Sequence, residues 1–173
     1  MLASSLSMTV FTTTVQNAVL AAKDTVDAPT AEELALQQHE AETAAKIDAY
    51  FAQYKLPLAG HGMTFVTEAE KNGIPWTLVA AIGMAESTGC KFVIPGTNNC
   101  FGWGGGRIKF ASIDEAIIEI SANLGGNDDA TAHYYDGKSL QQILHMYNPP
   151  KVAPEYEGKV MHIMKAIDAM QLS

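Results

Sequence analysis

The chain of 173 residues has little of what several common classes of protein require. Only 11 Lys and Arg stand against 19 Asp and Glu, whereas proteins that bind nucleic acid depend on basic residues that neutralise phosphates. No unbroken apolar run approaches the length of about 20 residues that a transmembrane helix needs. We therefore expect no nucleic-acid partner and no transmembrane span. The length and the 47% of hydrophobic residues suit one soluble globular domain with a real core.

The motifs of several kinds of site are also absent. The sequence has no Cys-x-x-Cys pair and no His-Glu-x-x-His pattern. The spacing of its histidines matches no known set of metal ligands, so we expect no metal. No Gly-x-Ser-x-Gly elbow surrounds Ser87, which argues against a serine hydrolase. The glycine cluster at residues 102–106 is not followed by the Lys-Ser or Lys-Thr of a phosphate loop, so we expect no cofactor.

Capping signals and apolar spacing predict an all-α fold around one buried helix. Three helical patterns begin at a pair of residues of the capping-box type. The pairs are Thr30 with Glu33, Ser112 with Glu115 and Ser139 with Gln142. The only β-like runs are residues 91–95 and 107–110, which could form at most a small β-hairpin. The expected helices cover residues 30–56, 63–72, 74–88, 112–124, 127–137, 139–147 and 155–170.

Composition divides the chain into three parts. Residues 1–29 are a signal-like or disordered segment followed by a polar linker, residues 30–56 an N-terminal helix, and residues 57–173 the main domain. Residues 1–22 are uncharged and moderately apolar and end in small residues that a signal peptidase could accept, but they lack a basic start. A trimmed or atypical signal peptide, a disordered tail and an extra helix all fit this segment.

The candidate catalytic residue is Glu86, which ends the apolar run IPWTLVAAIGMAE at residues 74–86. Pro75 suits a first helical residue, so Glu86 is expected in the last turn of a buried helix. The negative end of the helix dipole and the apolar neighbours both favour the neutral acid over the carboxylate. A neutral Glu can donate a proton near neutral pH, as the general acid of glycosidic bond cleavage must.

The loop after Glu86 offers the mixture of groups that binds sugars. Asn98 and Asn99 supply amide hydrogen-bonding groups, and Phe101 and Trp103 supply ring faces. The glycines at positions 102 and 104–106 let the backbone come close to a ligand. The stretch therefore favours a carbohydrate site beside Glu86.

The pattern AIGMAES at residues 81–87 followed by NNCFGWGG at residues 98–105 resembles lysozyme-like peptidoglycan hydrolases. The families concerned are the bacterial endo-β-N-acetylglucosaminidases and the lytic transglycosylases, in which a helix ends in a catalytic Glu-Ser and an Asn-x-Phe-Gly-like turn follows. Tyr147-Asn148 falls where the transglycosylases carry a Tyr-Asn pair. The resemblance covers residues 57–170 and implies a lysozyme-like catalytic domain.

This resemblance implies an extracytoplasmic enzyme, in the cell envelope or secreted, that cleaves the glycan strands of peptidoglycan as a monomer. Glu86 would be the general acid. The sequence has no acid between Glu86 and Asp114, where the glucosaminidases tend to supply a second one, and a lytic transglycosylase needs only one. The missing acid also leaves open a module that binds glycan without cutting it. The substrate-binding residues would be Ser87, Asn99, Phe101, Gly102, Trp103, Tyr147 and Asn148.

Cys90 and Cys100, the two cysteines of the chain, bracket the loop that holds Asn98 and Asn99. If the protein is exported, a disulfide between them would hold this loop in shape and stabilise the fold by about 2.5–3 kcal/mol on the chain-entropy model. Two free, packed thiols are the alternative.

Overall fold

The computed structural model describes residues 28–172. The chain divides into two units between Leu34 and Ala35. The signal-like segment at residues 1–22 lies outside the described residues. Of the predicted linker, residues 28 and 29 are described, and they precede the first described helix.

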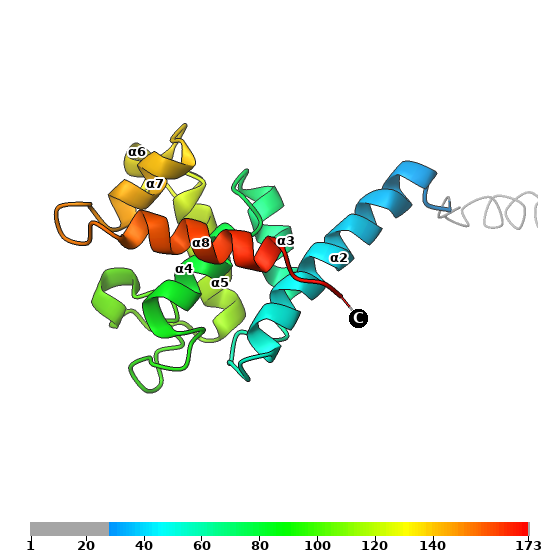
Figure 1. The fold of residues 1–173 in the computed structure, drawn as a ribbon. Helices are drawn as coiled ribbons and strands as arrows, with labels where there is room; N and C mark the ends of the chain where they lie inside the picture. Colours follow the sequence, from blue (N-terminus) through cyan, green and yellow to red (C-terminus); the bar gives the residue numbers. More distant parts are fainter. Residues whose placement is uncertain (1–27, 173) are drawn as a thin grey trace, which may run out of the picture. The chain divides into compact units, whose positions relative to one another are not determined.

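All regular structure in residues 28–172 is helical, which confirms the all-α prediction (Figure 1). Seven α-helices are described, together with one short 3-10 helix in the glycine turn. They are α2 (Ala31–Ala52), α3 (Gly62–Lys71), α4 (Leu78–Ser87), η1 (Trp103–Gly106), α5 (Ile113–Leu124), α6 (Ala132–Tyr135), α7 (Leu140–Tyr147) and α8 (Tyr156–Asp168).

Helix α4 lies at the centre of the second unit. Its first six residues, from Leu78 to Gly83, are all buried, so the helix is apolar on every side and needs neighbours all round. Helix α8 packs along it, and α3 and α5 pack against it and against each other (Figure 1). From α5, Ile117, Ile120 and Leu124 enter the core with no exposed surface. A single hydrophobic cluster therefore surrounds the helix that carries Glu86.

Helix α2 begins at a capping box and ends in the core. Glu33 N–H donates to the Thr30 hydroxyl at 3.2 Å, and Thr30 N–H donates to the Glu33 carboxylate at 2.7 Å. The last turns bury Ile47 and Phe51, and the Phe51 ring stacks on Phe65 of α3 with centroids 6.4 Å apart. The end of the helix therefore contributes to the same core as α4.

Two helix starts differ from the sequence prediction. Helix α4 begins at Leu78 and not at Pro75, because Pro75 forms a turn in which its carbonyl accepts from Leu78 N–H at 2.9 Å. Helix α6 begins at Ala132, because the Asn127 side chain donates to Asn72 at 3.0 Å and caps no helix.

The possible β-hairpin does not form among the described residues. Residues 91–95 and 107–110 are turns and irregular chain. Cys90, Gly96 and Asn98 have φ of 72°, 77° and 51°, and such left-handed residues interrupt an extended strand. A backbone hydrogen bond from Phe110 N–H to the Thr97 carbonyl at 2.9 Å joins the second segment to the chain just after the first.

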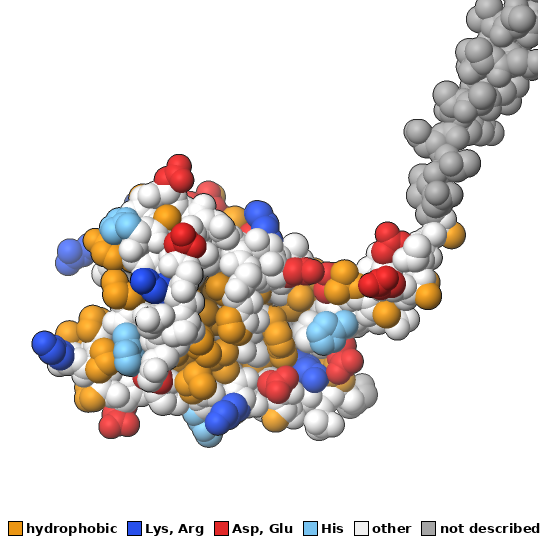
Figure 2. All heavy atoms as spheres, turned by 90° about the horizontal axis from the view of Figure 1, so that it is seen from above, with side chains coloured by type: hydrophobic (Ala, Val, Ile, Leu, Met, Phe, Trp, Pro, Cys, Tyr) orange, Lys and Arg blue, Asp and Glu red, His pale blue; other side chains and the backbone are white. Residues whose placement is uncertain are grey.

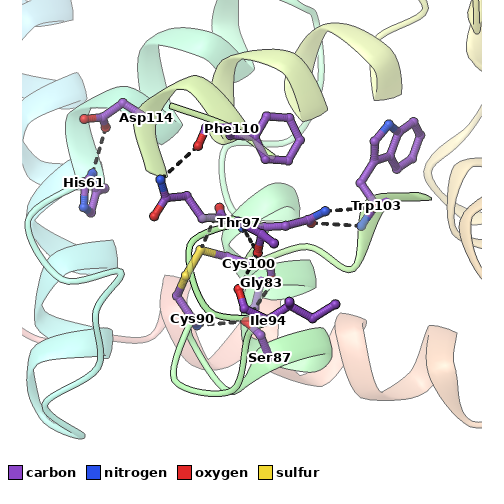
Figure 3. Close-up of a disulfide and its surroundings, with 12 residues drawn as sticks. His61, Gly83, Ser87, Cys90, Ile94, Thr97, Cys100, Trp103, Phe110 and Asp114 are labelled. Carbon is purple, nitrogen blue, oxygen red and sulfur yellow. Dashed lines mark hydrogen bonds and ion pairs between the residues drawn. A yellow bond between two sulfur atoms is a disulfide. The ribbon is translucent and has the colours of Figure 1, made fainter. Parts of the chain in front are cut away.

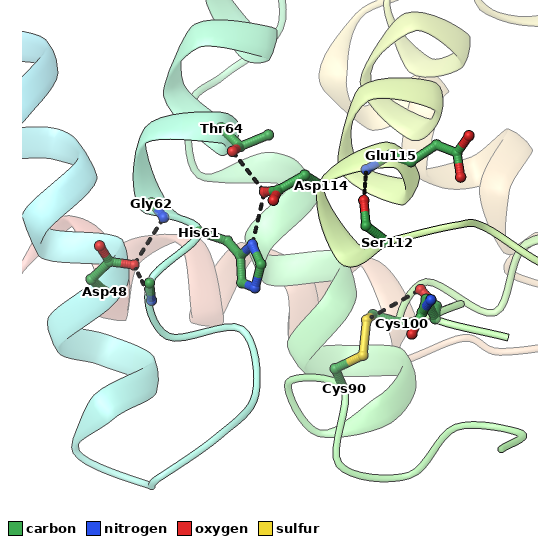
Figure 4. Close-up of polar contacts among 11 residues, drawn as sticks. Asp48, His61, Gly62, Thr64, Cys90, Cys100, Ser112, Asp114 and Glu115 are labelled. Carbon is green, nitrogen blue, oxygen red and sulfur yellow. Dashed lines mark hydrogen bonds and ion pairs between the residues drawn. A yellow bond between two sulfur atoms is a disulfide. The ribbon is translucent and has the colours of Figure 1, made fainter. Parts of the chain in front are cut away.

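Asp114 joins the start of α5 to α3. Its Oδ1 lies 2.7 Å from the His61 Nδ1 atom and accepts from the Thr64 hydroxyl at 2.7 Å (Figure 4). These hydrogen bonds, from His61 first and Thr64 second, lower the pKa of the Asp114 carboxyl. The carboxylate thus links two helices that are far apart in the sequence.

The surface carries both signs of charge around an apolar patch. On the face seen from above, hydrophobic side chains gather in the middle and acidic and basic side chains are scattered around them (Figure 2). Within residues 28–172, no helix combines the length and the apolar character needed to cross a membrane.

Two glycine-to-alanine substitutions should change stability in opposite directions. A Cβ at Gly83 in α4 would lie 2.8 Å from Leu58 Cδ1 and 3.0 Å from Phe101 Cε1, so Gly83→Ala should lower the free energy of unfolding by about 1–3 kcal/mol. A Cβ at Gly158 in α8 meets no atom within 4 Å, so Gly158→Ala should raise it by up to about 1 kcal/mol. Urea unfolding of both variants checks this, and a stabilised Gly83→Ala protein would contradict the packing of α4.

Asp114→Asn should lower stability only where the carboxylate is ionised. A lowered pKa in the folded state contributes stability above the ordinary value of 3.8 that is lost as the pH falls through the folded-state pKa. The side chain is 47% exposed, so the loss at pH 7 should stay below about 1 kcal/mol. Urea midpoints from pH 7 to pH 2 should converge for parent and variant at the acid end. Asp129→Asn, at an exposed residue, should match the parent throughout.

Candidate functional site

A pocket of about 320 Å³ opens where the end of α4, the disulfide loop and the glycine turn meet. This volume lies at the lower end of the range found for ligand sites, about 300–1,000 Å³. Three of the predicted binding residues line it together with Glu86. The lining residues are Glu86, Ser87, Phe92, Val93, Ile94, Asn99, Gly102, Gly105 and Gly106.

Glu86 lies in the last turn of α4, as expected, because α4 ends at Ser87 and Thr88 turns left-handed with φ of 54°. Its side chain is exposed, so the apolar enclosure expected from the sequence is wrong. The glycine turn closes one side of it: a Cβ at Gly102 would lie 2.7 Å from Glu86 Oε2, and Gly102 has φ of 67°. The backbone conformation favours glycine there, and a Cβ would have to displace the Glu86 carboxyl group.

A buried tyrosine, Tyr156, and a partly buried one, Tyr147, lie near Glu86. The Tyr147 hydroxyl donates to the Phe101 carbonyl. The Tyr156 hydroxyl oxygen is buried and has no hydrogen-bond partner among the described residues. Burial raises the pKa of Tyr156, and interaction with Tyr147 and with the Glu86 carboxylate raises it further. The Tyr156 phenol therefore stays neutral. Its hydroxyl is an unused donor close to the Glu86 carboxyl group, although no hydrogen bond joins the two side chains.

Four aromatic rings connect the glycine turn to three helices. Trp103 lies 5.7 Å from Tyr147 of α7 and 6.4 Å from Tyr135 of α6, measured between ring centroids. Tyr147 stacks in turn on Tyr156 of α8 at 6.1 Å and 9°. The half-buried Trp103 is thus held from behind, and the turn that contacts Glu86 is fixed to the C-terminal half of the domain.

Ser87 is committed to the fold. Its hydroxyl donates to the Cys100 carbonyl at 2.7 Å and accepts from Cys90 N–H at 2.9 Å, and only 4% of the residue is exposed (Figure 3). The single hydroxyl proton is therefore in use, although the residue borders the pocket. Ser87 ties the end of α4 to both cysteines.

Asn99 is committed in the same way. Its amide nitrogen donates to the carbonyls of Trp103 at 2.8 Å and Ile108 at 3.1 Å, and its amide oxygen accepts from Trp103 N–H at 3.0 Å. The neighbouring Asn98 donates to the Phe110 carbonyl at 2.9 Å. Both amides shape the loop.

The other predicted binding residues divide between core and surface. Phe101 has no exposed surface, and its ring meets Phe65 edge-on at 6.4 Å, so only its backbone is near the pocket. Asn148 ends α7 as a partly exposed C-cap residue whose N–H donates to the Leu144 carbonyl at 2.9 Å. Phe101, Trp103, Tyr147 and Asn148 are not among the residues that line the pocket.

Sequence reasoning missed the apolar wall of the pocket. Phe92, Val93 and Ile94 line it, and Phe92 is 68% exposed and Ile94 48% exposed. The sequence predicts a β-like run at these residues. The signal that could have indicated a pocket wall is an apolar run inside the loop between Cys90 and Cys100. Tyr156 also lies near Glu86, and nothing in its local sequence indicates this.

A lysine also meets the end of α4. Lys159 of α8 donates from Nζ to the Ala85 carbonyl at 2.6 Å. A cation here compensates the negative end of the helix dipole next to Glu86.

Cys90 and Cys100 form a disulfide, with their Cα atoms 4.5 Å apart (Figure 3). It closes the loop that carries the apolar wall and begins three residues after the end of α4. In the described part of the chain, no three His, Cys, Asp or Glu side chains converge to hold a metal ion.

No protein-family model matches this chain, and no curated protein sequence matches it either. A functional assignment therefore depends on the residues and geometry of the pocket.

Removing the disulfide should destabilise the fold. Cys90→Ser with Cys100→Ser should lower the free energy of unfolding by about 2.5–3 kcal/mol, because the unfolded chain regains the entropy of an open loop. Urea unfolding measures the difference. The parent protein in reductant should shift to the midpoint of the double variant, and equal midpoints with and without reductant would contradict a stabilising disulfide.

Proposed function

We propose that this protein cleaves the glycan strands of peptidoglycan with Glu86 as general acid. The observation that carries the proposal is the position of the Glu86 carboxyl group at the edge of the pocket, against Gly102 and opposite an apolar wall. A sugar ring in this pocket would have its flat face on apolar side chains and its hydroxyls near glycine backbone, which is the chemistry of carbohydrate binding. The resemblance to lysozyme-like domains adds the substrate.

The single acid of the pocket favours the lytic transglycosylase type over two-carboxylate hydrolysis. Glu86 is the only Asp or Glu among the lining residues, whereas hydrolytic glycosidases place two carboxyl groups about 5–9.5 Å apart. In the proposed reaction, Glu86 donates its proton to the glycosidic oxygen as the bond from the muramyl C1 to that oxygen breaks. The carboxylate then takes the proton of the muramyl 6-hydroxyl, whose oxygen bonds to C1 and closes an anhydro ring. A glucosaminidase would need a second acid from outside these residues.

The proposed place of action is outside the cytoplasm. A disulfide such as Cys90–Cys100 persists in oxidising compartments, where the proposed substrate also lies.

Glu86→Gln should abolish cleavage and leave the fold intact. Because loss of a general acid costs about 100-fold or more in rate, the variant should give no clearing in a peptidoglycan zymogram. Glu119→Gln, a matched change at an exposed residue of α5, should clear as the parent does. Mass spectrometry of the soluble fragments from the parent should detect anhydro-muramyl ends. Reducing ends would refute the transglycosylase type, and undiminished clearing by Glu86→Gln would refute the role of Glu86.

A glycan-binding module without activity is the second candidate, because the pocket contains only one acid. Its signature is sedimentation of the parent with purified sacculi and no soluble fragment at any protein concentration.

A further inference from the structure

The loop that forms the pocket is basic within an acidic protein. The chain has a net charge of −8, yet no Asp or Glu occurs between Glu86 and Asp114. The same stretch holds Lys91, Arg107 and Lys109, and all three are exposed. We call these three residues the cationic rim.

Hydrogen bonds hold the two segments of the rim together. The Asn99 side chain donates to the Ile108 carbonyl at 3.1 Å, between Arg107 and Lys109. Phe110 N–H donates to the Thr97 carbonyl at 2.9 Å, so the segment after the glycine turn is tied to the disulfide loop that carries Lys91. The three cations therefore belong to one hydrogen-bonded unit and not to independent loops.

The cations of the rim are available to an anion from outside the domain. Lys91, Arg107 and Lys109 form no ion pair with any residue in the described range, whereas Lys46 and Lys71 pair with acids on their own helices. Lys91 Nζ lies 5.4 Å from the centroid of the Phe92 ring, which belongs to the apolar wall of the pocket. A cation thus stands directly beside the surface to which the proposed function assigns a sugar.

We propose that the cationic rim selects glycan strands whose sugars carry anionic substituents next to the cleavage site. This inference rests on the proposed function. The acidic remainder of the surface repels an anionic polymer, and a basic edge around the pocket offsets that repulsion where the strand must enter. Carboxylates of peptide stems and phosphates of wall polymers share the required chemistry.

The experiment compares binding and cleavage of four preparations of the same sacculi. One is untreated, one lacks peptide stems after amidase treatment, one lacks phosphate polymers after hydrofluoric acid treatment, and one lacks both. Because amidase treatment also removes the cross-links that keep sacculi insoluble, the strands of all four preparations are first coupled to beads. Retention of the Glu86→Gln protein on the beads then measures binding without cleavage, and fragment release by the parent measures activity. The rim variant is Lys91→Gln, Arg107→Gln, Lys109→Gln. The control variant is Lys55→Gln, Lys138→Gln, Lys165→Gln, which removes three exposed cations from outside the stretch between Glu86 and Asp114.

In low salt, proteins with an intact rim should bind and cleave untreated sacculi about tenfold better than doubly stripped ones, and high salt should remove the difference. The two preparations with a single treatment show whether the preference depends on the peptide stems or on the phosphates. The rim variant should lose the preference, and the control variant should keep it.

Equal preference in rim and control variants, or no preference in the parent, overturns the inference. Cleavage without preference would refute the rim alone, and preferential binding without fragment release would refute the proposed cleavage alone.

Discussion

The hydroxyl group of Ser87 is the interaction on which the pocket depends. It is buried at the end of α4, and it joins that helix to Cys90 through an accepted hydrogen bond and to Cys100 through a donated one. Without it, two buried backbone groups would lose their partner, at about 1–3 kcal/mol each. Glu86 is the preceding residue, so the same contacts that fix the disulfide loop also fix the carboxyl group relative to the glycine turn. Stability and the geometry of the site are therefore set by the same few atoms.

This arrangement leaves the ligand-facing groups to backbone and apolar side chains. The polar side chains of Ser87 and Asn99 are occupied by internal hydrogen bonds, and the Tyr147 hydroxyl is occupied by the Phe101 carbonyl. What faces the pocket is Glu86, the glycine backbone and the wall that includes Phe92. Backbone groups held in a rigid turn lose little entropy when they bind a ligand, so a fixed glycine turn is a suitable partner for sugar hydroxyls.

The sequence predicted those features that local physics determines. The capping pair Ser139–Gln142 and the place of Glu86 in the last turn of a buried helix follow from short-range patterns, and the structure has both. The exposure of Glu86 could not be predicted, because it depends on how closely the glycine turn approaches and which side it leaves open. Nor could the partners of Asn99 be predicted, since an amide that can bind a sugar can equally bind backbone carbonyls nine residues away. Tyr156 approaches Glu86 only through the packing of α8 on α4.

The exposure of Glu86 constrains how a lone acid could work. Water screens an exposed carboxyl group from the negative end of its helix, so the bound sugars themselves must exclude solvent. The wall at Phe92 lies where a sugar ring would complete the enclosure. Once the proton has left, the carboxylate needs a partner. The neutral Tyr156 hydroxyl has an unused donor nearby, and Lys159 occupies the Ala85 carbonyl beside it. One acid would then serve in both steps, because the buried Tyr156 hydroxyl and the exposed Lys159 ammonium stabilise its charged form between them.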